Sequence, residues 1–233
     1  TRPPSQQPTI PAGGTLEVLV AGRFGVPADA AALSLNVTAV GPGAAGFLTV
    51  YPCGQSRPNA SSLNYVAGQT VPNAVLSKVG TGGAICVFSQ QATNVIVDLN
   101  GWFAQPPSFT SLTPTRVADT RVGEPVAFPF PKQALTAGQT LEIPVTGQFG
   151  VPTDAGAVTL NVTAVGPFAA GFLTVFPCGV AQPNSSNVNY VAGQIVPNEV
   201  ITAVGTSGKV CVFTSQATNL VVDVGGWFPK NSI

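Results

Sequence analysis

The chain has 233 residues, of which 45% are hydrophobic and only 8% are charged. Nine basic and nine acidic side chains cancel, which excludes proteins that use a strongly basic surface to bind nucleic acid or an acidic membrane. Gly and Pro interrupt every apolar run before it reaches the roughly 18 residues of a membrane-spanning helix, so we expect no transmembrane segment.

The sequence is duplicated. The stretch from Gly13 to Phe103 returns, without a gap and mostly unchanged, from Gly138 to Phe228. So long a period indicates two copies of a whole domain, because the units of solenoid repeats run to about 20–50 residues. We expect a first domain at 1–105, a linker with a lead-in segment at 106–137 and a second domain at 138–233.

In chain order, the first copy contains seven alternating or continuous apolar runs, at 15–22, 31–40, 46–52, 61–67, 71–80, 84–89 and 93–99. The runs are rich in Val, Leu and Thr, and Gly and Pro separate them. No sustained helical period is present. The pattern predicts an all-β protein with two homologous antiparallel β-sandwich domains in tandem.

Two features predict details of the sheets. Pro72 and Pro197 fall inside predicted strands, and proline has no backbone N–H to donate, so we expect these strands to be sheet edges or bulged. The Asn-Gly pair at 100–101 becomes Gly-Gly at 225–226, which predicts a type I′ turn or a bulge.

Each copy carries one pair of cysteines, Cys53 with Cys86 and Cys178 with Cys211, at the same separation and in the same local sequence. These pairs predict one disulfide per domain and an oxidising compartment. The alternative is a zinc site, which is disfavoured because each copy offers two thiols, no His and no Cys-x-x-Cys spacing.

The lead-in segment LTPTRVADTR, at 112–121, places Arg116, Asp119 and Arg121 close together in a chain with few charges. We favour a docked segment whose arginines bind a carboxylate or backbone carbonyls of the following domain. The alternative is a site for an anion or a partner.

The first copy begins shortly after Thr1-Arg2, where the second copy has Thr120-Arg121 and the rest of its lead-in. We expect the polypeptide to be a mature or excised part of a longer array. A domain without its lead-in strand could accept one from a neighbour, and strand addition of this kind can build a homo-oligomer or a filament.

The order of motifs resembles one known group of domains. LTPTRVADTR, NVTAVGP, GFLTVYPCG, LNYVAGQ and the VDLNGWF ending together resemble a β-domain of secreted and cell-surface proteins of actinobacteria. The resemblance covers nearly the whole chain, apart from Gly225 in the second ending and the lead-in missing from the first copy. It implies an extracellular, disulfide-bearing bacterial domain, often in tandem or beside secreted hydrolases, and it assigns no binding or catalytic residues.

An enzyme is not expected. The absence of His and the expected oxidation of the cysteines remove Ser-His-Asp and Cys-His catalysis. Glu17 and Asp98 could act as a glycosidase pair only if both faced one cleft. We also expect no metal and no cofactor, because single acidic side chains supply too few oxygens for calcium.

The repeated aromatic residues are candidate sugar platforms. They are Tyr65 and Tyr190, each near Asn and Gln, and Trp102 and Trp227. The alternative is that the tyrosines pack at a sheet rim and the tryptophans close the ends of the sandwiches.

The sequence therefore predicts a non-catalytic structural or adhesive module, extracellular or on the cell surface, that self-assembles by strand addition. The alternative is a module that binds carbohydrate or cell wall beside a secreted enzyme. The expected partners are further copies of the chain or a polysaccharide, and not nucleic acid.

Overall fold

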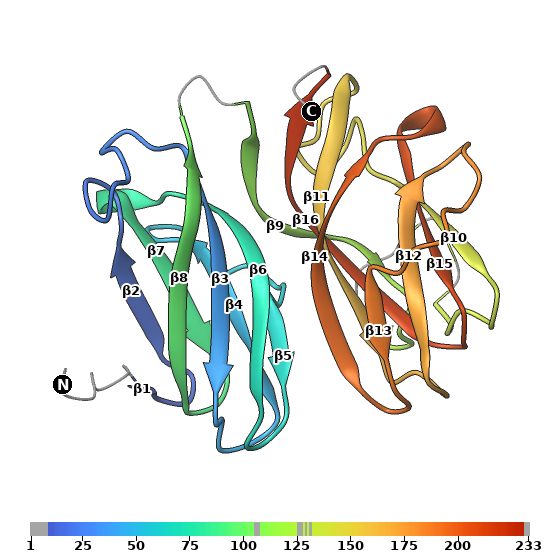
Figure 1. Cartoon of the computed structure of the whole chain (residues 1–233), viewed down its shortest axis with the longest axis horizontal. Helices are drawn as coiled ribbons and strands as arrows, with labels where there is room; N and C mark the ends of the chain where they lie inside the picture. Colours follow the sequence, from blue (N-terminus) through green and yellow to red (C-terminus); the bar gives the residue numbers. More distant parts are fainter. Residues whose placement is uncertain (1–8, 105–107, 125–127, 129, 131, 231–233) are drawn as a thin grey trace. The chain divides into compact units, whose positions relative to one another are not determined.

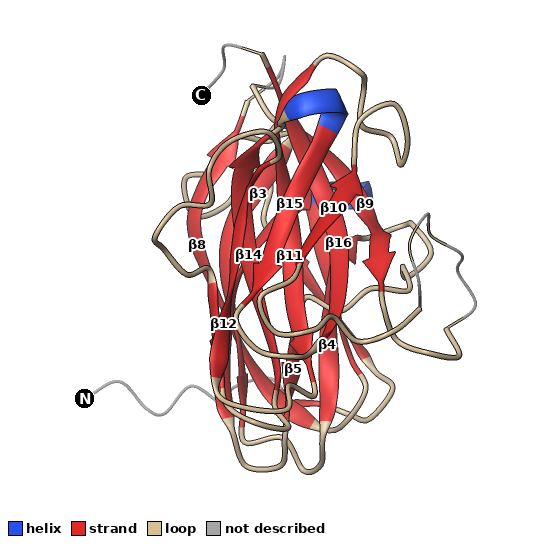
Figure 2. Ribbon diagram, turned by 90° about the vertical axis from the view of Figure 1, so that its right-hand side faces the viewer, coloured by secondary structure: helices blue, strands red, loops and turns tan. Residues whose placement is uncertain are grey.

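The structure is a computed structural model and describes residues 9–104, 108–124, 128, 130 and 132–230. Thr1-Arg2, on which the expectation about the start of the chain depends, lies outside the described residues. Apart from two short 3-10 turns, η1 (Thr81–Gly83) and η2 (Thr206–Gly208), the described elements are strands (Figures 1 and 2). This is the predicted all-β fold. Among the described residues, no helix is long and apolar enough to cross a membrane.

The chain divides into unit 1, Thr1–Gln105, and unit 2, Pro106–Ile233. Each unit holds two four-stranded antiparallel sheets around its own hydrophobic core, and each has one disulfide. The expected pair of tandem β-sandwiches is therefore present. The segment at 106–137, described above as a linker, falls inside unit 2.

Unit 1 consists of one sheet in the order β1-β8-β3-β6 and a second in the order β2-β7-β4-β5. Its strands are β1 (Thr9–Ile10), β2 (Thr15–Leu19), β3 (Ala32–Val40), β4 (Gly46–Pro52), β5 (Leu63–Tyr65), β6 (Thr70–Lys78), β7 (Ala84–Ser89) and β8 (Thr93–Phe103).

Unit 2 repeats this arrangement, with sheets in the orders β14-β11-β16-β9 and β10-β15-β12-β13. Its strands are β9 (Thr110–Asp119), β10 (Thr140–Pro144), β11 (Ala155–Val165), β12 (Gly171–Pro177), β13 (Val188–Tyr190), β14 (Ile195–Ala203), β15 (Lys209–Thr214) and β16 (Asn219–Pro229).

Side-chain alternation explains why these segments form half-buried strands. Along β3, Leu33, Leu35 and Val37 enter the core of unit 1, while Ser34 and Asn36 occupy the opposite face. Successive side chains of a strand point to opposite sides of the sheet, so this spacing places one apolar row between the two sheets.

The prolines and the glycine pairs have clear positions. Pro72 lies in β6 and Pro197 in β14, and both strands are sheet edges, where a missing N–H breaks no ladder. The pair at 100–101 lies inside β8, where the register with β3 shifts by one residue. Of the two expected alternatives, the structure has the bulge rather than the turn, and the same shift recurs between β11 and β16.

The cysteines form the predicted disulfides, Cys53–Cys86 and Cys178–Cys211. In each unit the bond joins the residue that follows an inner strand, β4 or β12, to the neighbouring strand, β7 or β15. It therefore fixes the start of the loop that follows, at 53–62 in unit 1 and 178–187 in unit 2.

Strand β9 is the main difference between the units. It pairs antiparallel with β16 from Asp119, opposite Val221, to Thr110, opposite Trp227. In unit 1 the equivalent strand β8 pairs on that side with β1 at Thr93 and Asn94 alone, among the residues that the structure describes.

Candidate functional site

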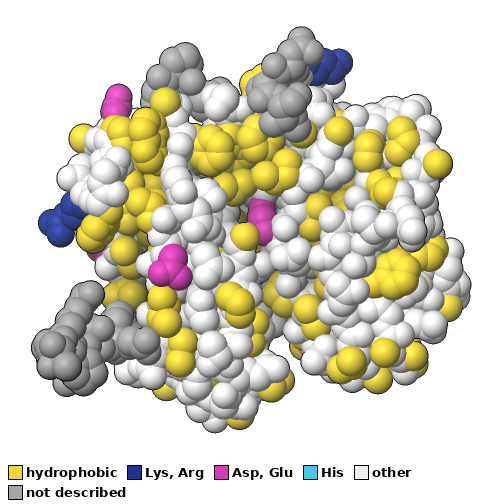
Figure 3. All heavy atoms as spheres, in the orientation of Figure 1, with side chains coloured by type: hydrophobic (Ala, Val, Ile, Leu, Met, Phe, Trp, Pro, Cys, Tyr) yellow, Lys and Arg dark blue, Asp and Glu magenta, His cyan; other side chains and the backbone are white. Residues whose placement is uncertain are grey.

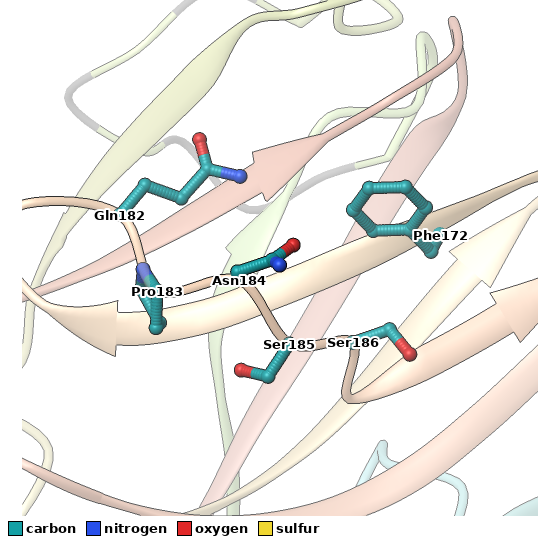
Figure 4. Close-up of a pocket in the computed structure, with 6 residues that line it drawn as sticks. All are labelled: Phe172, Gln182, Pro183, Asn184, Ser185 and Ser186. Carbon is teal, nitrogen blue, oxygen red and sulfur yellow. The ribbon is translucent and has the colours of Figure 1, made fainter.

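A hollow of about 380 Å³ lies on the outer face of the β10-β15-β12-β13 sheet of unit 2. Phe172, from β12, forms one wall, and the loop between β12 and β13 forms the rest. The lining residues are Phe172, Gln182, Pro183, Asn184, Ser185 and Ser186 (Figure 4).

The loop is held at both ends. The Cys178–Cys211 disulfide fixes its start. Near its end, the Thr174 hydroxyl of β12 donates to the carbonyl oxygen of Ser185 at 2.5 Å, and the Asn187 side chain accepts from the β12 main chain at 2.7 Å. These bonds tie a loop without regular secondary structure to a buried strand, so the lining side chains stand on a fixed frame.

The lining chemistry is uncharged. Gln182 and Asn184 each offer an amide that both donates and accepts hydrogen bonds, and both residues are exposed. In Figure 4 the Asn184 side chain extends toward the half-buried Phe172 ring. An aromatic face beside amides and hydroxyls suits a ligand with C–H faces and several hydroxyl groups.

The same place in unit 1 is built differently. Arg57 stands where unit 2 has Gln182, and its guanidinium carbon lies 4.0 Å from the centre of the Phe88 ring. Phe88 is the equivalent of Phe213, whose ring lies 6.0 Å from that of Phe172. In unit 1 the Arg57 cation therefore covers the face of the Phe88 ring. In unit 2 the uncharged Gln182 places no cation over the equivalent ring of Phe213.

A second hollow, of about 590 Å³, lies at one end of unit 2. It is lined by Trp227 and by the loop from Gly147 to Asp154, apart from Phe149, which packs against the core. The loop contains Phe149 at a φ of 55°, a left-handed conformation that is unusual for a residue other than glycine, and Phe24 in unit 1 repeats it at 53°. Asp154 gives this hollow a charge, which distinguishes it from the hollow at Phe172.

The structure does not bring the four aromatic candidates into one site. Tyr65 and Tyr190 are only 3% and 4% exposed, and their hydroxyls bond to Ser89 and Thr214, each at 2.9 Å. Neither tyrosine can offer a ring face as a platform, because both rings lie in the hydrophobic cores. This corrects their assignment as sugar platforms.

The tryptophans remain near the surface. Trp227 is partly buried against the core of unit 2 and lines the second hollow, whereas Trp102 is 43% exposed. The sequence alone does not distinguish the two tryptophans, because their difference in exposure comes from the elements that surround each ring.

The arginines of the lead-in segment lie in a compact ion-pair network. Arg116 Nε donates to Asp223 Oδ1 at 2.6 Å, and its Nη1 donates to Asp119 Oδ2 at 2.9 Å. Arg121 contacts Asp119 at 2.7 Å and Glu124 at 3.2 Å. The segment is thus fixed to a carboxylate of β16.

The network carries no excess positive charge for an anion, because two arginines face three carboxylates. Burial alone would raise the pKa of Asp119, but hydrogen bonds from Arg121 and the charges of both arginines hold that pKa below its usual value. Burial raises the pKa of Asp223 to about 6, and the Arg116 guanidinium opposes this shift. Asp223 is therefore largely ionised at neutral pH, as the ion pair requires.

The proposed glycosidase pair does not form. Glu17 lies on β2 in one sheet and Asp98 on β8 in the other. Both are exposed, whereas their strand neighbours pack against the core between the sheets, so the two carboxylates point outward from opposite faces. They cannot flank one sugar ring.

The hollow at Phe172 was not predicted, although the sequence holds a clue. The loops that follow the first cysteine differ between the two copies, with Gln-Ser-Arg at 55–57 in one and Val-Ala-Gln at 180–182 in the other. A loop that differs in sequence and in charge between two similar copies can mark a surface on which the copies have separate roles.

Comparison with known proteins places the chain in no family. No protein-family model matches it, and no curated protein matches it. Among solved structures, it is similar to the N-terminal CBM22-1–CBM22-2 tandem domain of Xyn10C from Paenibacillus barcinonensis. The identity is 12%, the match covers 94% of this chain and 83% of that chain, and the TM-score is 0.25. A TM-score of this size carries no conclusion about common function.

Proposed function

We propose that this chain is a non-catalytic, extracellular carbohydrate-binding module that takes a neutral polysaccharide in the hollow at Phe172. The observation that carries the proposal is the uncharged lining of that hollow, in which an aromatic ring stands beside two amides and two hydroxyls. The proposal adopts the alternative function derived from the sequence rather than the adhesive one, because it rests on a built concave site.

The disulfides and the low surface charge agree with this role. The two disulfides fit an oxidising environment outside the cytoplasm. On the face drawn in Figure 3, acidic and basic side chains are few and scattered. A neutral, hydroxyl-rich polymer can approach such a surface without displacing bound counterions. We also propose that the chain belongs to the actinobacterial surface β-domains that its motifs resemble.

Retention on insoluble polysaccharides and titration with soluble oligosaccharides test the proposal. Phe172→Ala removes the ring face, which should weaken binding by about tenfold, equivalent to about 1.4 kcal/mol. Asn184→Ala should weaken it less, because one neutral hydrogen bond contributes about 0.5–1.5 kcal/mol. Phe47→Ala, the equivalent change in unit 1, is the matched control and should leave binding unchanged.

The difference between the units supplies a second test. Gln182→Arg introduces the residue of unit 1, and the new guanidinium should cover Phe213 as Arg57 covers Phe88. The variant should fold normally and lose retention. If wild-type protein binds no neutral polysaccharide, or if Phe172→Ala and Gln182→Arg bind as well as wild type, the proposal is wrong.

A further inference from the structure

Strand β9 shows what the outer edge of β16 accepts. Its pairing with β16 covers Val221 to Trp227 and continues where the Thr120 N–H donates to the Leu220 carbonyl at 3.0 Å. Val221 and Val222 are then 4% and 0% exposed. An edge strand presents a row of unpaired N–H and C=O groups, and β9 satisfies this row in unit 2.

Strand β8 has nearly the same sequence as β16, TNVIVDLNGWF against TNLVVDVGGWF. Beyond Asn94, no strand among the described residues pairs with its outer edge. Ile96 and Val97, the equivalents of the two buried valines, are partly exposed. The strand is long, carries one charged side chain and has no proline, so it has few of the features by which edge strands avoid pairing.

Strand β8 carries a carboxylate, Asp98, at the position where β16 binds an arginine. Asp98 is the equivalent of Asp223, which is 2% exposed and binds Arg116 through both carboxylate oxygens, at 2.6 and 3.4 Å. Asp98 is exposed. A carboxylate at this register position can receive a guanidinium from an incoming strand in the same two-point geometry.

Strand β8 also has a glycine, Gly101, at the position where an aromatic ring covers β16. At Gly226, a Cβ atom would meet the ring of Phe109, the residue before β9, at 2.3 Å, so the ring lies directly over the glycine. The equivalent Gly101 has no described atom within 4 Å of such a Cβ, and the neighbouring Trp102 is 43% exposed. Gly101 thus leaves room for an aromatic ring that no described residue of unit 1 supplies.

We propose that the outer edge of β8, from Ile96 to Trp102, is a docking site for an extended polypeptide strand supplied by another chain. The strand runs antiparallel to β8 and carries the pattern of residues 109–119, with an aromatic residue first, an arginine seven positions later and an aspartate three positions after that. The aromatic ring lies over Gly101, the arginine binds Asp98, and main-chain hydrogen bonds extend the sheet. This edge belongs to unit 1, whereas the proposed sugar site belongs to unit 2.

The probe is a synthetic peptide of residues 108–121, with blocked termini, titrated into the intact chain. We expect saturable binding of one peptide per chain and slower amide hydrogen exchange along β8. Asp98→Asn should weaken binding by about tenfold or more, because it removes a charged two-point hydrogen bond. A peptide carrying Arg116→Gln should show a similar loss. Glu17→Gln changes an exposed carboxylate on β2, in the other sheet of unit 1, and is the matched control.

Gly101→Val is the steric test. A Cβ atom at this position has no described atom within 4 Å, so we expect the fold to be kept, while the side chain occupies the place of the incoming ring. Binding that survives both Gly101→Val and Asp98→Asn contradicts the proposal. So does an absence of saturable binding, and so does faster exchange along β9 without slower exchange along β8, which would mean that the peptide displaces β9 of unit 2.

Discussion

At the scale of single residues, each position in one unit can be compared with the equivalent position in the other unit. Gly226 and Gly101 occupy equivalent places in a strand bulge, yet the Phe109 ring lies over Gly226 and no ring among the described residues lies over Gly101. Asp223 and Asp98 differ in the same way, since one binds an arginine and the other is exposed. Identical residues therefore carry different energies in the two units, because of what the adjacent strand supplies.

Gly226→Ala tests this difference. The added methyl overlaps the buried Phe109 ring, which is 0% exposed and also contacts Phe228, so we expect unit 2 to lose about 1–3 kcal/mol of stability. Gly101→Ala should change stability little. Denaturant unfolding of both variants, followed separately for each unit by hydrogen exchange, measures the contrast. Equal effects at the two positions would show that the ring yields readily.

Sequence patterns located some of these residues and missed others. The cysteine pairs could be predicted because each recurs in the same local sequence with no competing partner. The prediction of the tyrosines as sugar platforms was wrong, because a repeated aromatic residue beside amides gives the same sequence pattern whether it lies in a core or on a surface. Only the bonds from Tyr65 to Ser89 and from Tyr190 to Thr214 distinguish the two cases.

At the scale of elements, local alternation predicted most strands, whereas β9 was placed in a linker. The strand holds Pro114 and several polar residues, and its register with β16 is irregular in this stretch. It is an edge strand, so a residue without an N–H is tolerated. The charge cluster predicts that its arginines bind a carboxylate of the following domain, and Arg116 binds Asp223. No local pattern, however, gives the register of a pairing with a strand about a hundred residues later.

The loop at 178–187 gives a prediction for an element. The paired change Cys178→Ser with Cys211→Ser opens the loop at its start, and it should lower the stability of unit 2 by about 3–4 kcal/mol on the chain-entropy model. It should also weaken polysaccharide retention, because the lining side chains lose their frame. The paired change Cys53→Ser with Cys86→Ser should destabilise unit 1 and leave retention unchanged. Thermal unfolding and retention, measured on both variants, separate the two outcomes.

At the scale of the whole molecule, the two units share one fold but differ in their surfaces. Unit 2 has a strand over its β16 edge and an uncharged hollow. Unit 1 has a cation over the equivalent aromatic face, and beyond Asn94 no strand of its described residues pairs with the outer edge of β8. One fold thus presents two different surfaces. A tandem of this kind can hold a polymer through one unit and another chain through the other.

The near absence of charge predicts how binding responds to salt. Neither the ring, the amides nor the hydroxyls of the hollow at Phe172 form ion pairs with a neutral polymer, so retention should change less than twofold between about 0.05 and 0.5 M NaCl. The β8 edge should respond differently, because its pairing includes a contact between Asp98 and an arginine, and peptide binding should weaken over the same range. Measuring both on one preparation makes each the control for the other. Retention that falls steeply with salt would mean that the polymer is charged, and that the carboxylate-bearing hollow at Trp227 or another surface holds it.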